Sequence, residues 1–406
     1  MERKQQLVLI LILGALSTIS PFAIDMYLPG FPAIAEDLDT SVASVQLSLT
    51  SYFVGIAAGQ LAYGPLLDRF GRKKPLYAGL AVYAVASLSC ALTRSVEMLI
   101  AVRFLQALGG CAGMIAAQTL VRDLFPAHRT AHVFSWMILV IAVSPMVAPT
   151  VGGYLTASLG WQSVFVTLSI ITLIILILVY YLLPAGNAPD KSVSLLPASV
   201  LRNFYAVIRN RQFLLYCVAG GLASAAPFAF IAGSADVYIN RYGTSEQVYG
   251  WIFALVGGTI IACAQLNHVL LRKFSSHRII SISMIYQGIM GAILVAGVVT
   301  GIFGILTLTI MTVLFLSVHG LTNANATALA LAPFTKNTGS AASLLGTFRM
   351  ALAGVVTALV SVFHDGSAAP MVAMMAVCVF AGLMALATAR VILHTRREAK
   401  ANSTAH

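Results

Sequence analysis

Charged residues are scarce in this sequence. Asp, Glu, Lys and Arg together make up only 9% of the 406 residues, whereas a soluble domain typically contains about 25%. Hydrophobic residues reach 59%. This balance excludes a soluble globular domain and indicates a polytopic membrane protein.

The sequence also lacks the motifs of common enzymes and ATPases. It contains no Walker-type phosphate loop, no paired metal ligands and no nucleophile elbow. The cysteines are odd in number and lie in apolar runs, so they indicate neither a disulfide framework nor a metal site. We therefore expect no enzymatic activity, no metal and no cofactor, and an ion gradient as the energy source. The cysteines are Cys90, Cys111, Cys217, Cys263 and Cys378.

The sequence contains many long apolar runs. A hydrocarbon core about 30 Å thick requires roughly 20 helical residues, and twelve runs approach or exceed that length. They predict an all-α integral membrane protein with twelve transmembrane helices. The runs are 7–29, 43–66, 75–92, 96–120, 131–155, 162–183, 213–239, 247–271, 278–300, 302–333, 340–363 and 368–392.

The second half of the chain weakly repeats the first. The string LLRKFSSHR from Leu270 stands where LLDRFGRKK stands from Leu66, as in a parallel repeat of six helices. We therefore expect a six-helix bundle over residues 1–183, a cytoplasmic linker over 184–212 and a second six-helix bundle with a short tail over 213–406. Apolar residues at helical spacing predict an interfacial helix in the linker.

The cations are distributed unevenly between the two sides of the membrane. With the amino terminus placed inside and the sides alternating, 20 of the 24 Lys and Arg residues fall in cytoplasmic segments. This bias predicts that both termini are cytoplasmic. The net charge of +11 then reflects membrane orientation, and we expect no nucleic-acid partner.

A charged turn separates the second and third apolar runs. Within GPLLDRFGRKKPL, Gly64–Leu76, the side chains of Asp68 and Arg72 must lie in water or among head groups. A generic positive-inside loop would explain the cations but neither the glycines nor Asp68. The pattern resembles the loop between the second and third helices of the major facilitator superfamily (MFS), which implies the MFS fold and a gate at the cytoplasmic side.

The resemblance implies partners for this gate. Arg122 and Asp123, at the inner end of the fourth helix, are expected opposite Asp68 in a charge network. We expect Asp68 to pair with Arg122 and to cap the start of the eleventh helix near Ser340 when the protein faces outward.

An acid lies near the outer end of the first helix. Asp25, in SPFAIDMYLPGFP, is costly in an apolar span unless its site is wet, paired or protonatable, although it could also be an ordinary interfacial acid. The string IDMYLP resembles the bicyclomycin/chloramphenicol resistance (Bcr/CflA) group of drug:proton antiporters. The resemblance implies a multidrug efflux protein of the bacterial inner membrane, and Asp25 is the candidate for proton coupling and drug binding.

The fourth helix carries Arg103 and Gln106 in RFLQALGG. An arginine in an apolar span should face the bundle interior and contact a carboxylate or a carbonyl. Asp25 is the obvious acid, and the alternative is an arginine that extends to the outer interface. Both residues match the fourth-helix motif of the family and are candidates for substrate binding.

The fifth helix contains SPMVAPTVGG, with Pro145, Pro149, Gly152 and Gly153. These residues weaken helical hydrogen bonding and allow close helix packing, so they predict a bend. Such a bend could be purely structural. However, APTVGG resembles the signature that accompanies antiporters in the superfamily, which favours efflux.

Two charged residues stand out in the second half. Arg349, in TGSAASLLGTFRM, is either a substrate contact or a structural anchor of the eleventh helix. Asp236, near the outer end of the seventh helix, is more typical of an interfacial acid than of a second proton site.

The remaining candidates for substrate binding are apolar. Phe22, Met137, Phe228 and Phe230 could form a pocket for varied amphipathic molecules. We therefore expect a monomer in the lipid bilayer that exchanges small drugs for protons. A proton-coupled uptake symporter for a small metabolite, a transporter-like sensor and a passive channel are the alternatives.

Overall fold

The computed structural model describes residues 3–184, 186–191, 197–334 and 338–404, and the regular elements of these ranges are all helical. The first half contains α1 (Arg3–Asp25), the short helix η1 (Leu28–Gly30), α2 (Phe31–Asp37), α3 (Val42–Phe70), α4 (Lys73–Ala91), α5 (Val96–Leu124), α6 (Ala127–Leu159) and α7 (Gln162–Leu182). The linker contains α8 (Pro197–Ile208).

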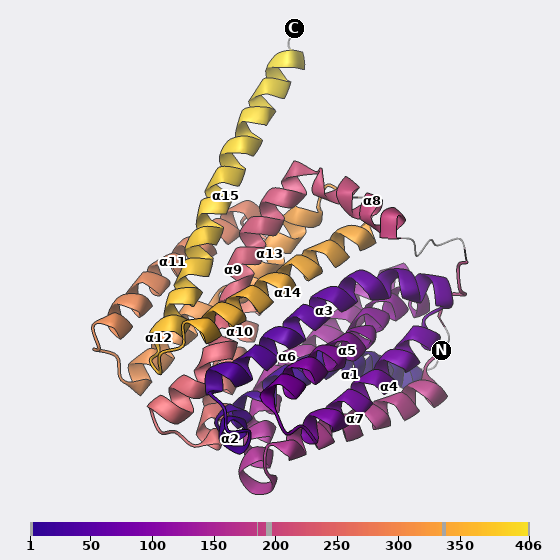
Figure 1. The fold of residues 1–406 in the computed structure, drawn as a ribbon. Coiled ribbons are helices and arrows are strands. Elements are labelled where there is room, and N and C mark those ends of the chain that lie inside the picture. Colours follow the sequence, from indigo (N-terminus) through magenta and orange to yellow (C-terminus); the bar gives the residue numbers. More distant parts are fainter. Residues whose placement is uncertain (1–2, 185, 192–196, 335–337, 405–406) are drawn as a thin grey trace.

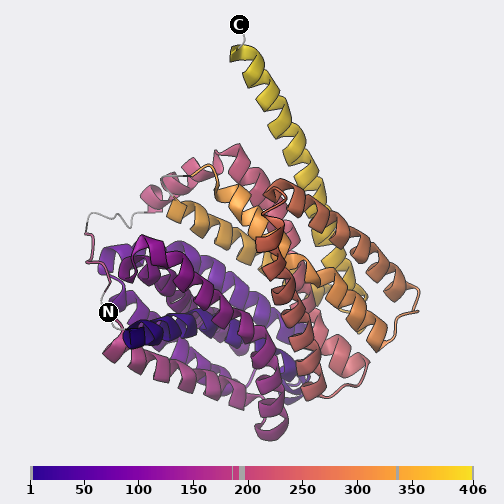
Figure 2. The same ribbon diagram turned by 180° about the vertical axis from the view of Figure 1, so that it is seen from behind.

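The second half contains α9 (Arg211–Ala235), the π-helical turn η2 (Asp236–Arg241), α10 (Glu246–Leu270), α11 (Ser276–Val299), α12 (Ile305–Ser317), α13 (His319–Leu331), α14 (Thr338–Val362) and α15 (Ala369–Thr404). In Figures 1 and 2, α1 to α7 gather on one side of the molecule and α9 to α15 on the other, with α8 at one end. The protein thus consists of two helical bundles joined by a linker.

Polar residues mark the beginnings of several helices. The side chains of Ser41, Ser95, Asn210 and Ser245 each accept a hydrogen bond from a backbone N–H in the first turn of α3, α5, α9 and α10. Such N-caps satisfy donors that the helix itself leaves free. They explain why these helices begin where the apolar runs of the sequence begin.

Ten helical segments are long and apolar enough to cross a membrane, counted over the described residues. Helices α4 and α6, of 19 and 33 residues, occupy the positions of the other two predicted spans. The prediction of many apolar helices is confirmed. The total of twelve spans and the cytoplasmic position of the termini stay predictions.

Two of the predicted runs are interrupted helices. The first run continues past Asp25 through η1, where Pro29 starts a new turn, and into α2. The tenth run is divided at Val318 between α12 and α13, where the Ser317 hydroxyl donates to the Leu314 carbonyl. Side-chain hydrogen bonds of this kind compete with the helical backbone.

The main contacts between the two bundles are those of α3 with α14 and of α6 with α10, and η1 and α2 add smaller contacts with α9, α10 and η2. Two hydrogen bonds join α3 and α14. The Ser361 hydroxyl donates to the Ala43 carbonyl, and the Ser343 hydroxyl donates to the Gln60 carbonyl. We call the side of Asp68 and Asp123 the inner side and the side of Asp25 and Glu246 the outer side.

Candidate functional site

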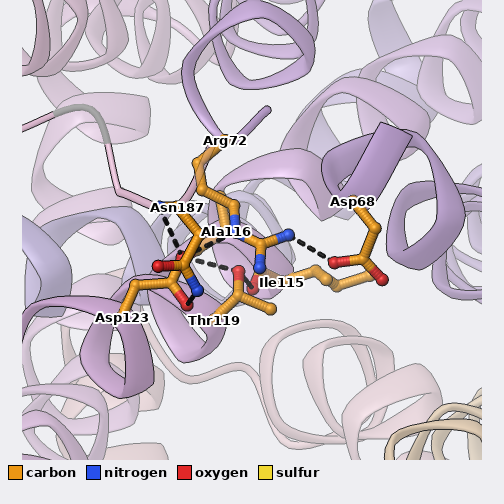
Figure 3. Close-up of polar contacts among 7 residues, drawn as sticks. All are labelled: Asp68, Arg72, Ile115, Ala116, Thr119, Asp123 and Asn187. Atoms are coloured by element: carbon orange, nitrogen blue, oxygen red, sulfur yellow. Dashed lines mark hydrogen bonds and ion pairs between the residues drawn. The ribbon is translucent and has the colours of Figure 1, made fainter. Parts of the chain in front are cut away.

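A cluster of charged residues lies at the inner ends of α3, α4 and α5 (Figure 3). Arg72 donates from Nη1 to Asp68 Oδ1 and from Nε to Asp123 Oδ2, the latter at 2.7 Å. Asn187 of the linker donates to the same Asp123 carboxylate from its backbone N (3.2 Å) and from Nδ2 (2.7 Å). The cluster therefore ties three helix ends to the start of the linker.

The two acids of this cluster differ in exposure. The Asp123 side chain is 7% exposed and that of Asp68 is 51% exposed. Burial of Arg72 disfavours its charge, but hydrogen bonds and charges of Asp123 and Asp68 outweigh this, so the pKa of Arg72 lies above its usual value. Arg72 is thus held as a cation between a buried acid and a half-exposed one.

The expected ion pair between Asp68 and Arg122 is not formed in this structure. Within the described part of the chain Asp68 pairs with Arg72, and Arg122 is exposed. Adjacent residues of an α-helix point about 100° apart, so when Asp123 faces the cluster Arg122 cannot. The expected contact of Asp68 with the start of α14 near Ser340 concerns the outward-facing state and stays a prediction.

Asp25 is the last residue of α1 and is buried, with 5% of its surface exposed. It has no ion pair among the residues whose side chains the structure describes. The turn η1, which begins three residues after Asp25, contacts α9 and α10 of the second bundle. An acid of the first bundle therefore lies at its junction with the second.

Arg103 on α5 is completely buried and lies in the bundle interior. Its Nη1 donates to Gln106 Oε1 (2.6 Å) and its Nη2 to the Ala23 carbonyl (3.1 Å). The guanidinium carbon lies 4.7 Å from the ring centroid of Tyr27 and 4.1 Å from that of Tyr52. Such positions over aromatic rings stabilise a desolvated cation.

The expected pairing of Arg103 with Asp25 is not what the structure shows, since its partners are Gln106, a carbonyl and aromatic rings. Ala23 lies in the last turn of α1, where carbonyl groups lack an intrahelical partner. Gln106 donates in turn from Nε2 to Ser87 Oγ (2.7 Å). Arg103 and Gln106 thus belong to a buried hydrogen-bond network of the first bundle.

The residues expected to bend α6 lie at close helix contacts. A Cβ atom on Gly152 would lie 2.1 Å from the Met26 carbonyl oxygen, and one on Gly153 would lie 2.6 Å from the Glu246 carbonyl oxygen. Pro145 packs against Gly257, and α6 is continuous through Pro145 and Pro149. The small residues therefore let α6 approach η1 and α10 at the outer side.

The four apolar candidates separate into two kinds. Met137 and Phe230 are buried in the hydrophobic core, where the Phe230 ring lies 5.5 Å from that of Phe253. Phe22 and Phe228 are partly buried, and Phe228 makes an edge contact with Phe53 of the other bundle at 4.8 Å between centroids. Of these four residues, Phe22 and Phe228 are partly exposed in this conformation.

In the second bundle, Arg349 on α14 meets polar residues of α13. Its Nη2 donates to Thr327 Oγ1 at 2.9 Å. His319, Asn323 and Thr327 recur every four residues and share one face of α13. His319 and Asn323 were not predicted from the sequence. Polar residues at four-residue spacing within an apolar run are the signal that could have identified them.

Asp236 is buried at the start of η2 and has partners on both oxygens. Asn240 Nδ2 donates to Oδ1 and His364 Nε2 contacts Oδ2, each at 2.7 Å. His364 follows α14 and is distant in sequence, so the sequence analysis did not connect it with Asp236. This acid is engaged within the second bundle, unlike Asp25.

Two bundles of apolar helices that meet around a buried acid, with a charge cluster at one end, define a helical membrane transporter. The sequence pattern of the Major Facilitator Superfamily matches residues 13–358. The chain belongs to this superfamily and is a multi-pass membrane transporter, not an enzyme.

Its relatives include proteins named for drug resistance. The chain is 32% identical to a bicyclomycin resistance protein homolog of Haemophilus influenzae over 95% of this chain and 96% of that protein. It is 29% identical to a chloramphenicol resistance protein of Pseudomonas aeruginosa over 68% of this chain and 65% of that protein. These similarities confirm the predicted relationship to the bicyclomycin/chloramphenicol resistance group.

Solved transporter structures share the fold. A D-xylose–proton symporter superimposes with a TM-score of 0.72 at 16% identity, over 94% of this chain and 96% of that one. At this identity the likeness concerns the fold alone. It confirms that the architecture is that of an MFS transporter.

Proposed function

We propose that this protein exports small amphipathic drugs, of the bicyclomycin or chloramphenicol kind, across the bacterial inner membrane in exchange for protons. The observation that carries the proposal is the Asp25 carboxyl, which is buried at the junction of the two bundles without an ion pair among the described residues. The names of the relatives support a drug as the transported molecule.

Asp25 is the proposed coupling acid. A carboxylate is costly to bury without a counter-ion, so closure of the outer side around Asp25 favours a bound proton. Opening of that side would admit water and alter the cost of ionisation. One carboxyl group can then bind a proton on one side of the membrane and release it on the other, because access to it alternates.

Contacts between the bundles at the outer side support an inward-facing arrangement. There Gly153 of α6 lies against the backbone of Glu246 on α10, and η1 contacts α9 and α10. At the inner side Asp68 is half exposed. In the proposed cycle, separation of the outer contacts accompanies closure of the inner gate formed by Asp68, Arg72 and Asp123.

Drug binding is assigned to the surfaces between the bundles. Phe22 and Phe228 provide partly exposed aromatic area there, and such area accepts molecules of varied shape. The binding surfaces come from a single chain, so we propose that the monomer is the transporting unit. Binding or release of a proton by Asp25 would change the charge of these surfaces.

Transport by everted membrane vesicles tests direction and coupling together. With an acidic lumen, proton efflux from the vesicle should drive radiolabelled chloramphenicol inward above the level of vesicles without the protein, and a protonophore should abolish the difference. Loss of preloaded drug under the same gradient would indicate a symporter. Equilibration unaffected by the gradient would indicate a passive channel, and no transport at all would favour a sensor.

A further inference from the structure

The second bundle buries a guanidinium group without a carboxylate partner. Arg349 Nε is buried and has no hydrogen-bond partner, and Nη2 has one neutral acceptor, Thr327 Oγ1. No acid forms an ion pair with Arg349 among the side chains that the structure describes. The cation is therefore incompletely satisfied by the protein.

The sequence explains why no acid is available. Residues 213–406 contain only four acids, Asp236, Glu246, Asp365 and Glu398. The first three lie at the outer ends of helices or in an outer loop, and Glu398 is in the last turns of α15, whereas Arg349 is in the middle of α14. A counter-ion for Arg349 must come from outside this bundle.

A second unsatisfied nitrogen lies on the helix that contacts Arg349. His319, the first residue of α13, shares a helix face with Thr327, the partner of Arg349, and its Nδ1 is buried without a partner. Asn323 follows one turn later and accepts a hydrogen bond from Ser224 of α9 at 3.4 Å. The Arg349 Nε donor and the His319 Nδ1 atom thus both lack hydrogen-bond partners.

The residues of this group are not fully buried. His319, Asn323, Thr327 and Arg349 are each partly exposed as residues, although the two unpaired nitrogens are shielded. A planar guanidinium group matches the geometry of a carboxylate with two parallel hydrogen bonds. A carboxylate entering here would neutralise the cation and supply the missing acceptors.

We propose that Arg349, assisted by His319, forms a subsite for the carboxylate of an amphipathic organic anion. The inference rests on the proposed transport function. It adds aryl carboxylates to the neutral drugs as a proposed class of substrate. The apolar part of such a molecule would extend toward partly exposed aromatic side chains such as Phe228. The binding step itself requires no proton, so it can be tested apart from transport.

The test compares two probes of nearly equal shape. Purified full-length protein in phosphatidylcholine nanodiscs is titrated with dansylglycine, which carries a carboxylate, and with dansylglycinamide, which is neutral. We expect dansylglycine to bind about tenfold more tightly, because its hydrogen bonds to Arg349 are charge-assisted. Equal binding of the two probes by the parent protein would overturn the subsite.

Variants assign the preference to this site. Arg349→Gln should bind the two probes equally, and Arg349→Lys should retain part of the preference because it keeps the charge. Arg241→Gln is the matched control, since Arg241 is exposed at the outer side, and it should keep the full preference. Folded Arg349→Gln and Arg349→Lys proteins that both retain the tenfold preference would place the carboxylate elsewhere.

Competition separates an organic anion from an inorganic one. Benzoate should displace dansylglycine, whereas sodium chloride at equal ionic strength should not, and equal displacement by both would overturn the assignment to organic carboxylates. Transport of neutral chloramphenicol by everted vesicles is measured in parallel. If the parent protein shows proton-driven transport of chloramphenicol but no preference for the carboxylate probe, the subsite alone is refuted. If it shows the preference but no proton-driven transport, only the proposed function is refuted.

Discussion

Each bundle buries one arginine in its interior, and the two arginines have opposite surroundings. Arg103 in the first bundle contacts Gln106, the Ala23 carbonyl and two tyrosine rings. Arg349 in the second bundle has one hydroxyl partner, and the Nε atom of each arginine is buried without a partner. The first cation is built into the packing of its bundle, and the second is left to interact with something else.

The acids of the two bundles show the reverse contrast. Asp25 in the first bundle is buried without an ion pair among the described residues, whereas Asp236 in the second has Asn240 and His364 on its oxygens. In each bundle one of these two charged groups has more partners than the other. In our proposal the acid without an ion pair binds the proton, and the cation with a single hydrogen-bond acceptor binds the ligand.

The largest expected effect is a difference in stability between variants of the two arginines. Arg103→Met would remove the cation from two tyrosine rings and leave Gln106 and the Ala23 carbonyl without a donor, at a cost of about 3–5 kcal/mol. Arg349→Met should change stability by about 1 kcal/mol or less, since the Thr327 hydroxyl also donates to the Asn323 carbonyl. Thermal unfolding of both purified proteins measures the difference, and similar melting temperatures would contradict the contrast.

The next prediction concerns the acids. Asp25→Asn should abolish uphill drug accumulation in everted vesicles, because the variant cannot bind and release a proton as access alternates. Asp236→Asn, the matched control, should still accumulate drug. If purified Asp25→Asn still releases a proton on drug binding and still concentrates drug, the coupling acid lies elsewhere.

The pH dependence of drug binding gives the same test at equilibrium. If drug and proton compete for the Asp25 site, binding to the parent protein should strengthen as the pH rises and the proton leaves. Asp25→Asn should bind drug as the parent does at high pH and lose this dependence. A variant whose affinity still follows the pH as in the parent would rule out competition at Asp25.

At the inner gate, the buried Asp123 and the half-exposed Asp68 are expected to differ in the same way, with a smaller effect on the free energy of unfolding. Asp123→Asn should lower the free energy of unfolding by about 1–3 kcal/mol, because its nearly buried carboxylate accepts hydrogen bonds on both oxygens. Asp68→Asn should change it by about 0.5 kcal/mol or less, since its side chain is half exposed, yet it should slow transport by weakening the closed gate. Parental transport rates in a well-assembled Asp68→Asn protein would remove Asp68 from the gate.

The smallest effect is expected at Thr327. Thr327→Val removes the one hydrogen bond that orients Arg349 but leaves its charge, so dansylglycine affinity should fall by about twofold, within the range of a neutral hydrogen bond. The thermal stability should be unchanged. A loss of affinity as large as that of Arg349→Gln would mean that Thr327 itself contacts the ligand.

The sequence by itself determined the class of protein, the spacing of the apolar helices and the residues that demand an explanation. The charges at Asp68, Asp25, Arg103 and Arg349 were evident because an ionisable group in an apolar span is costly wherever the helix packs. A helix in the linker was evident from the spacing of its apolar residues, and α8 forms there.

The tertiary structure alone decided which partners these residues have. The rotation of α5 turns Asp123 and not Arg122 toward Arg72, and the end of α1 offers Arg103 a carbonyl in place of Asp25. His364 reaches Asp236 across 128 positions of the chain, and Arg349 of α14 donates to Thr327 of α13, 22 positions earlier. Hydrophobic periodicity sets which residues form a helix, but the rotation of each helix about its axis depends on packing with neighbours that are distant in sequence.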